Sequence, residues 1–193
     1  EGSSILLRAD GIACNEAQSE VHDMPLETVR RLSCRDFEYK RHEDNCLLLE
    51  FAEYKAGDAP YSPPMPVMAI HEQLTAKEYR GPLTLRFTFT SEKVLTGLKL
   101  ALEDAEQHEI FLNGERAENI PEGYYFSRSF ETVKLPDSCR VGENELILKR
   151  EFVPLSKYKS AITSLFEHQK GCELESAYLL GDFAVIGQPE PTF

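Results

Sequence analysis

The stretch TLRFTFT at residues 84–90 alternates apolar and polar side chains along its whole length. Leu85, Phe87 and Phe89 fall on one side of an extended chain, while the threonines and Arg86 fall on the other. Because successive side chains of a β-strand face opposite ways, this alternation predicts a strand with one apolar face turned toward a core.

Strand character recurs toward the C-terminus, at residues 98–103, 108–112, 128–135, 145–153 and 177–186. Asn113-Gly114 follows the second of these stretches, and the pair favours a type I′ hairpin because both residues tolerate positive φ. Gly181-Asp182 interrupts the last stretch, which predicts a bulge or a tight bend there.

Helical spacing is clear only over 156–168, where apolar residues recur at helical intervals and Ser156 fits an N-cap. The first third of the chain is less regular. It contains a strand candidate at 5–7, a strand or helical turn at 26–32, a buried strand candidate at 46–51 and, at 58–66, a proline-rich ordered loop or polyproline stretch.

Many short strands separated by turns, with few helices, predict an all-β fold. We expect a jelly-roll β-sandwich with one short helix, and an open barrel is the alternative. Residues 67–187 are expected to form the sandwich core. Residues 1–66 are expected to be an irregular segment with a few strands packed on the sandwich, and 188–193 a tail.

Charge and composition narrow the choice of partners. The 193 residues include 33 acids and 21 bases, for a formal net charge of −12. Nucleic-acid binding needs clustered cations, and so does an anionic membrane surface, so neither partner is expected. No apolar run approaches the roughly 20 residues of a membrane helix. The composition predicts a soluble, acidic, globular protein.

The five cysteines form no CxxC pair, and their number is odd. This predicts isolated thiols in a reducing compartment, with a single Cys34–Cys46 disulfide as the alternative. The N-terminus carries no signal-peptide pattern, so it does not indicate a location. A role in glycan binding would instead suit the periplasm or the cell surface.

Motifs of catalysis are absent from the sequence. It contains no GxSxG, no phosphate-binding glycine loop and no HExxH, and its five histidines are scattered. We therefore assign no catalytic residue, no metal ligand and no cofactor. Glu103, Asp104, Glu106 and Glu109 surround a turn; they fit a solvated acidic hairpin, with a calcium site as the alternative.

Aromatic residues are the best candidates for ligand contact, because sugar rings stack their C–H faces on flat aromatic surfaces. The chain has no Trp, which disfavours strong glycan binding. Tyr124 and Tyr125 form one candidate pair, and Tyr79 with Arg80 forms the second. For both pairs the alternative is a structural role. Tyr124 and Tyr125 would then pack in the core or at a sheet edge, and Arg80 would form an ion pair with a carboxylate that fixes the start of a strand.

Five segments, taken together and in order, resemble a known family: residues 79–87, 98–103, 109–114, 141–148 and 175–183. Their sequences are YRGPLTLRF, LKLALE, EIFLNG, VGENELIL and ESAYLLGDF. This order is similar to the C-terminal jelly-roll region of large bacterial proteins related to family 106 α-L-rhamnosidases. It also resembles the galactose-binding-domain-like sandwich of family 2 glycoside hydrolases. The resemblance covers about residues 45–187.

In such proteins the catalytic carboxylates lie in a separate barrel domain, and nothing in this chain resembles that barrel. The resemblance therefore implies a non-catalytic carbohydrate-binding or accessory module of a glycoside-hydrolase-like protein. Its partner would be a carbohydrate or a neighbouring catalytic domain. The alternatives are a stand-alone glycoside hydrolase or lyase that uses paired carboxylates, and a structural module that binds protein.

Overall fold

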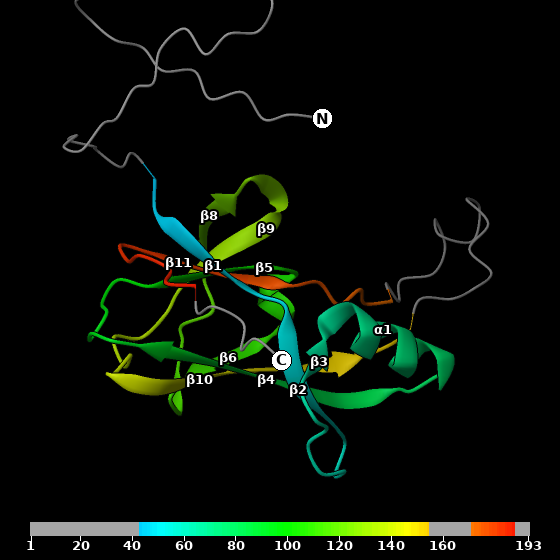
Figure 1. Cartoon of the computed structure of the whole chain (residues 1–193). Coiled ribbons are helices and arrows are strands. Elements are labelled where there is room, and N and C mark those ends of the chain that lie inside the picture. The colour runs from blue at the N-terminus through cyan, green and yellow to red at the C-terminus, as the bar shows by residue number, and fades with distance from the viewer. Residues whose placement is uncertain (1–42, 155–170, 188–193) are drawn as a thin grey trace, which may run out of the picture. The chain divides into compact units, whose positions relative to one another are not determined.

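The computed structural model describes residues 43–154 and 171–187, which form two antiparallel β-sheets and one short α-helix. Figure 1 shows the two sheets stacked on each other, with the helix at one end of the stack. The candidates at 5–7 and 26–32 and the helix expected at 156–168 lie outside the described residues.

Each sheet has a simple order of neighbouring strands. One sheet contains, in order, β1 (Asn45–Leu49), β11 (Ala177–Gly181), β5 (Lys99–Glu103), β9 (Ser127–Lys134) and β8 (Pro121–Tyr125). The other contains β3 (Met65–Pro66), β2 (Phe51–Ala56), β4 (Gly81–Ser91), β10 (Gly142–Phe152), β6 (Glu109–Leu112) and β7 (Glu115–Arg116).

The strand order is that of a jelly roll with extra edge strands. If β2, β3 and β8 are set aside, one sheet holds the first, eighth, third and sixth of the remaining strands. The other sheet holds the second, seventh, fourth and fifth. Two interlocked Greek keys produce this order. The predicted all-β sandwich with one short helix is thus confirmed.

The core lies between the sheets and is built mainly by alternation along β4 and β10. These two strands pair from Gly81–Phe152 to Ser91–Gly142, and their alternate side chains are buried. Leu85, Phe87 and Phe89 face inward as predicted. The Asn113-Gly114 turn is confirmed as well, since the two residues have φ of 49° and 83°.

The apolar stretch predicted as one strand at 46–51 is divided between the two sheets. β1 pairs with β11 and β2 pairs with β4, so the chain passes from one sheet to the other at Glu50. Leu49 and Ala52 are both buried, each beneath its own sheet. Residues 45–56 therefore contribute strands to both layers of the sandwich.

The helix of the described residues, α1 (Val67–Ala76), was not predicted from the sequence. Its first residue follows Pro66, and no side chain caps its N-terminus. The helix is held by packing: Val67, Ile70 and Leu74 are buried and belong to the core cluster. Their spacing is helical, but the sequence carries no clear signal that a helix begins directly after the prolines.

The strand expected at 177–186 ends at Gly181 and the chain bends at Asp182, so of the two predicted alternatives the structure has the bend and not the bulge. A Cβ at this glycine would lie 2.8 Å from Cδ2 of Leu98. Backbone therefore approaches the core more closely here than any larger residue allows. The chain then turns, and Nδ2 of Asn45 donates to the carbonyl of Phe183 at 3.0 Å.

One buried amide joins β10 to its neighbours. The fully buried side chain of Asn144 donates to the carbonyls of Arg140 and Gly142, at 2.8 and 2.9 Å. Its oxygen accepts hydrogen bonds from the Arg140 amide and from Nδ2 of Asn113, both at 2.8 Å. Asn113 in turn accepts from the Glu145 amide at 2.9 Å. All four bonding positions of the Asn144 amide are thus satisfied.

We expect Asn144→Asp to destabilise the domain by roughly 3–5 kcal/mol, because a buried carboxylate would face two carbonyl oxygens without a partner. Gln73→Glu, the same amide-to-acid change on the exposed side of α1, is the matched control and should cost less than about 0.5 kcal/mol. Urea unfolding of both variants measures the difference. Equal losses would show that the amide network does not stabilise the fold.

Candidate functional site

The outer face of the six-stranded sheet carries a shallow groove of about 320 Å³. Outward positions of β2, β4 and β10 form its floor, and the proline-rich loop forms one wall. The residues that line the groove are Phe51, Glu53, Pro64, Arg86, Thr88, Glu143 and Glu145. Phe51 is 59 % exposed, which leaves its ring available to a ligand.

Arg86 lies at the centre of the groove and bridges two carboxylates. Its guanidinium forms an ion pair and a hydrogen bond with Glu53 on β2. Its Nη1 lies 3.8 Å from Oε2 of Glu145 on β10. Since β4 lies between β2 and β10, the three charges form a row across the sheet.

The loop predicted at 58–66 is ordered up to residue 64 and continues into β3, and it places an aromatic ring over this row. The Tyr54 amide donates to Oγ of Ser62 at 3.0 Å, and the Ser62 amide donates to the Tyr54 carbonyl at 2.9 Å. The guanidinium carbon of Arg86 lies 4.1 Å from the centre of the Tyr61 ring, a cation–π contact. Burial raises the pKa of Tyr61.

This arrangement suits binding better than glycosidic catalysis. A glycosidase places two carboxyl groups on either side of the scissile bond. In the groove, the guanidinium of Arg86 fills the space between Glu53 and Glu145. The carboxylates and the Thr88 hydroxyl remain suitable as partners for ligand hydroxyls.

Two of the predicted ligand residues, Tyr124 and Tyr125, lie on β8 of the other sheet. Tyr125 belongs to an aromatic cluster that also contains Phe126, Phe130 and Tyr178. Tyr125 and Phe126 each lie 5.4 Å from the Tyr178 ring, and Phe126 lies 4.7 Å from Phe130. A hydrogen bond with the Cys46 thiol raises the pKa of Tyr125 to about 12. Tyr124 is 62 % exposed, whereas Tyr125 is half-buried within the cluster.

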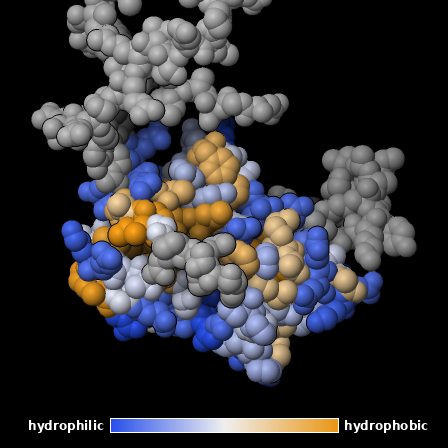
Figure 2. Space-filling model, in the orientation of Figure 1, coloured by the Kyte–Doolittle hydropathy of each residue, from blue (hydrophilic) through white to orange (hydrophobic). Residues whose placement is uncertain are grey.

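This cluster belongs to a larger apolar area on the outer face of the five-stranded sheet. In Figure 2, apolar side chains gather where Figure 1 draws β1, β9 and β11. Leu48 on β1 is 46 % exposed, and Phe126 between β8 and β9 is 65 % exposed. The two outer faces of the sandwich thus differ in chemistry.

The second predicted pair, Tyr79 and Arg80, lies at the entry to β4. The Tyr79 hydroxyl donates to the Pro82 carbonyl at 2.7 Å, and its ring stacks 6.4 Å from that of Phe152. Burial raises the pKa of Tyr79. Arg80 is exposed. The structure thus gives Tyr79 packing and turn contacts, and none of the four predicted residues lines the groove.

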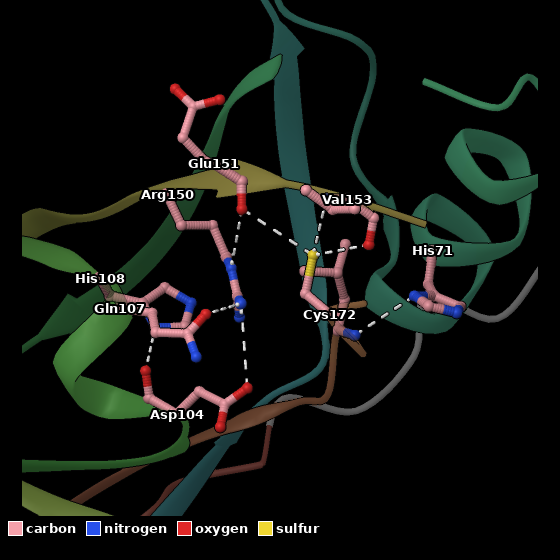
Figure 3. Close-up of polar contacts among 9 residues, drawn as sticks. His71, Asp104, Gln107, His108, Arg150, Glu151, Val153 and Cys172 are labelled. Atoms are coloured by element: carbon pink, nitrogen blue, oxygen red, sulfur yellow. Dashed lines mark hydrogen bonds and ion pairs between the residues drawn. The ribbon is translucent and has the colours of Figure 1, made fainter. Parts of the chain in front are cut away.

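A polar cluster near the C-terminal end of β10 joins the buried side chains of Arg150 and His108 to the exposed residues Asp104 and Gln107 (Figure 3). The side chain of Arg150 is only 3 % exposed; it donates to Oε1 of Gln107 at 2.7 Å and lies 3.8 Å from Oδ2 of Asp104. Burial and the Arg150 charge lower the pKa of His108 to about 4. The ring is therefore neutral at pH 7, and its Nδ1 donates to the Asp104 carbonyl at 3.0 Å.

The same region holds the segment that precedes β11. Sγ of Cys172 accepts from the Val153 amide at 3.0 Å, and the Cys172 amide donates to the Val153 carbonyl at 2.8 Å (Figure 3). Nδ1 of His71 on α1 accepts from the Leu174 amide at 3.3 Å. These contacts fix the chain against β10 and α1, and we assign them a structural role.

Within residues 43–154 and 171–187, no three His, Cys, Asp or Glu side chains are placed to hold a metal ion. Burial raises the pKa of Glu103, with nearby Glu175 as the next cause. The calcium alternative at this turn thus still rests on the sequence alone. In the same ranges, Cys46, Cys139 and Cys172 are free thiols, and Cys34 lies outside the described residues.

The chain matches none of the family models and none of the curated proteins with which it was compared. The described residues contain no helix that is both long enough and apolar enough to span a membrane.

Acid should destabilise the domain through His108. Its pKa in the folded state, about 4, lies below the ordinary 6.5, so the unfolded state binds more protons between these values. The stabilising contribution of neutral His108 is present above pH 6.5 and should decline by about 2–3 kcal/mol as the pH falls to 4. The stability difference between wild type and His108→Gln, measured by urea unfolding across this range, should shrink accordingly. A difference that is independent of pH would contradict the assignment.

The two adjacent tyrosines should differ in their effect on stability. Tyr125→Ala removes ring contacts and the Cys46 hydrogen bond, and we expect a loss of about 2 kcal/mol, less than for a fully buried ring. Tyr124→Ala removes an exposed ring and should change stability by less than about 0.5 kcal/mol. Thermal unfolding of the two variants gives the comparison, and a similar loss in both would place Tyr124 in the packed cluster too.

Proposed function

We propose that this sandwich is a non-catalytic module that binds carbohydrate in the groove on its six-stranded sheet, as an accessory part of a glycoside-hydrolase-like protein. The observation that carries the proposal is the combination, in one concave site, of the exposed Phe51 ring with several charged groups and the Thr88 hydroxyl. Sugar binding needs both an apolar platform for C–H faces and polar partners for hydroxyl groups.

The size of the groove supports a weak and local contact. Ligand pockets typically measure about 300–1,000 Å³, and this groove lies at the small end of that range. Phe51 would stack on one face of a sugar ring, while Glu143, Glu145 and Thr88 would accept hydrogen bonds from its hydroxyls. The resemblance to accessory sandwiches of glycoside hydrolases agrees with such a role.

The apolar area on the opposite sheet favours a second function, packing against a neighbouring catalytic domain. Exposed patches of this kind, rimmed by polar residues, commonly mark interaction sites. Leu48, Phe126 and Tyr124 would be its contact residues. Because this area and the groove lie on different sheets, one module has room for both functions.

A glycan-panel titration of the chain, followed by NMR, tests the proposal. We expect binding of a defined glycan with shifts at groove residues, and at least tenfold weaker binding by Phe51→Ala. Tyr124→Ala, also an exposed aromatic substitution, is the control and should bind as wild type does. Binding should persist after chelation of calcium.

Three results would contradict this proposal. Loss of binding in Tyr124→Ala with retention in Phe51→Ala would move the site to the tyrosines predicted from the sequence. Absence of binding by the folded chain to every glycan would favour the packing function instead. Hydrolysis of a glycan that is lost in Glu53→Gln or Glu145→Gln would favour the paired-carboxylate alternative.

A further inference from the structure

We infer that the groove discriminates by charge: it accepts neutral and amino sugars and rejects uronic acids. This inference rests on the proposed function and adds the substrate class. Three carboxylates and one guanidinium line the groove, which gives the site a formal charge of −2. A further carboxylate brought in by a ligand would be repelled.

The only cation among the lining residues is already engaged. Arginine recognises carboxylates through its fork of parallel N–H donors. In Arg86, Nε and Nη2 are both directed at Glu53, and Nη1 faces Glu145 at 3.8 Å. The Tyr61 ring lies against the guanidinium at 4.1 Å. A uronate would have to displace one of these partners before it could pair with Arg86.

Neutral and amino sugars meet no such obstacle. The carboxylates of Glu143 and Glu145 accept hydrogen bonds from hydroxyl groups, and they attract the ammonium group of an amino sugar. Glu143 is exposed and the Glu145 side chain is 40 % exposed, so both can be approached from solvent. We therefore expect affinity to follow the order amino sugar, neutral sugar, uronic acid.

Matched oligosaccharides of galactose, galactosamine and galacturonic acid, with the corresponding glucose set, provide the test. NMR titration of the full chain at 50 mM salt should show the uronic acid at least tenfold weaker than its neutral counterpart at the groove residues. At 1 M salt this difference in affinity between the uronic acid and the neutral sugar, called the affinity gap below, should become smaller, because screening weakens repulsion between exposed charges.

Glu145→Gln removes one repelling charge and frees Nη1 of Arg86. It should therefore reduce the affinity gap between the neutral sugar and the uronic acid about tenfold. Glu122→Gln on β8 removes the same charge from the other sheet and should leave the gap unchanged. The salt comparison needs no variant, so the inference remains testable if Glu145→Gln fails to fold.

The outcomes separate this inference from the proposed function. Galacturonic or glucuronic acid bound in the groove as tightly as the neutral sugar would overturn the charge inference and leave the glycan-binding module intact. A gap that neither Glu145→Gln nor high salt reduces would also overturn it, since the selectivity would then not be electrostatic. Failure of every sugar to bind the folded chain would overturn the proposed function itself.

Discussion

The buried amide of Asn144 fixes the register of β10, and the rest of the sandwich depends on that register. β10 is the strand that pairs with both β4 and β6, so any shift along it would disturb two ladders at once. A shift by one residue would also exchange its inward and outward side chains. Asn144 can satisfy its four hydrogen bonds only when it faces inward between Arg140 and Asn113. The amide therefore selects one register out of several that the leucines alone would permit.

The opposite end of β10 carries a second polar anchor. Arg150 also faces inward, and its buried side chain contacts the exposed residues Gln107 and Asp104. Burying a guanidinium brings a desolvation cost that an apolar residue would avoid, so its value lies more in specifying one arrangement than in raising stability. With Asn144 near one end, Arg150 near the other and Leu146 and Leu148 between them, the whole strand is held in register. Glu143 and Glu145 then point outward into the groove as a consequence.

Features that depend on neighbouring residues could be predicted from the sequence, whereas features that depend on residues far apart in the chain could not. Alternation along 84–90 and the Asn113-Gly114 turn are local patterns, and they correctly predicted β4 and a type I′ hairpin. The helix α1 follows a proline-rich loop without a capping side chain, so its local signal was weak. The apolar run at 46–51 predicted a buried strand. The structure shows instead that β1 and β2 pair in different sheets, so the run is buried as two strands and not as one.

The groove could not have been found from the sequence because it joins residues from three strands. Glu53 and Arg86 lie 33 positions apart, and only the register of β2 against β4 brings them opposite each other. Adjacent aromatic residues in the sequence pointed instead to Tyr124 and Tyr125, and the ring that Tyr125 contacts on another strand is that of Tyr178 on β11. Both the groove and the aromatic cluster combine residues from different strands, and these residues come together only when the strands pair in the sheets. The charged row lies on one outer face and the aromatic cluster on the other, so a sugar held at the groove would leave the aromatic face free to pack against a neighbouring domain.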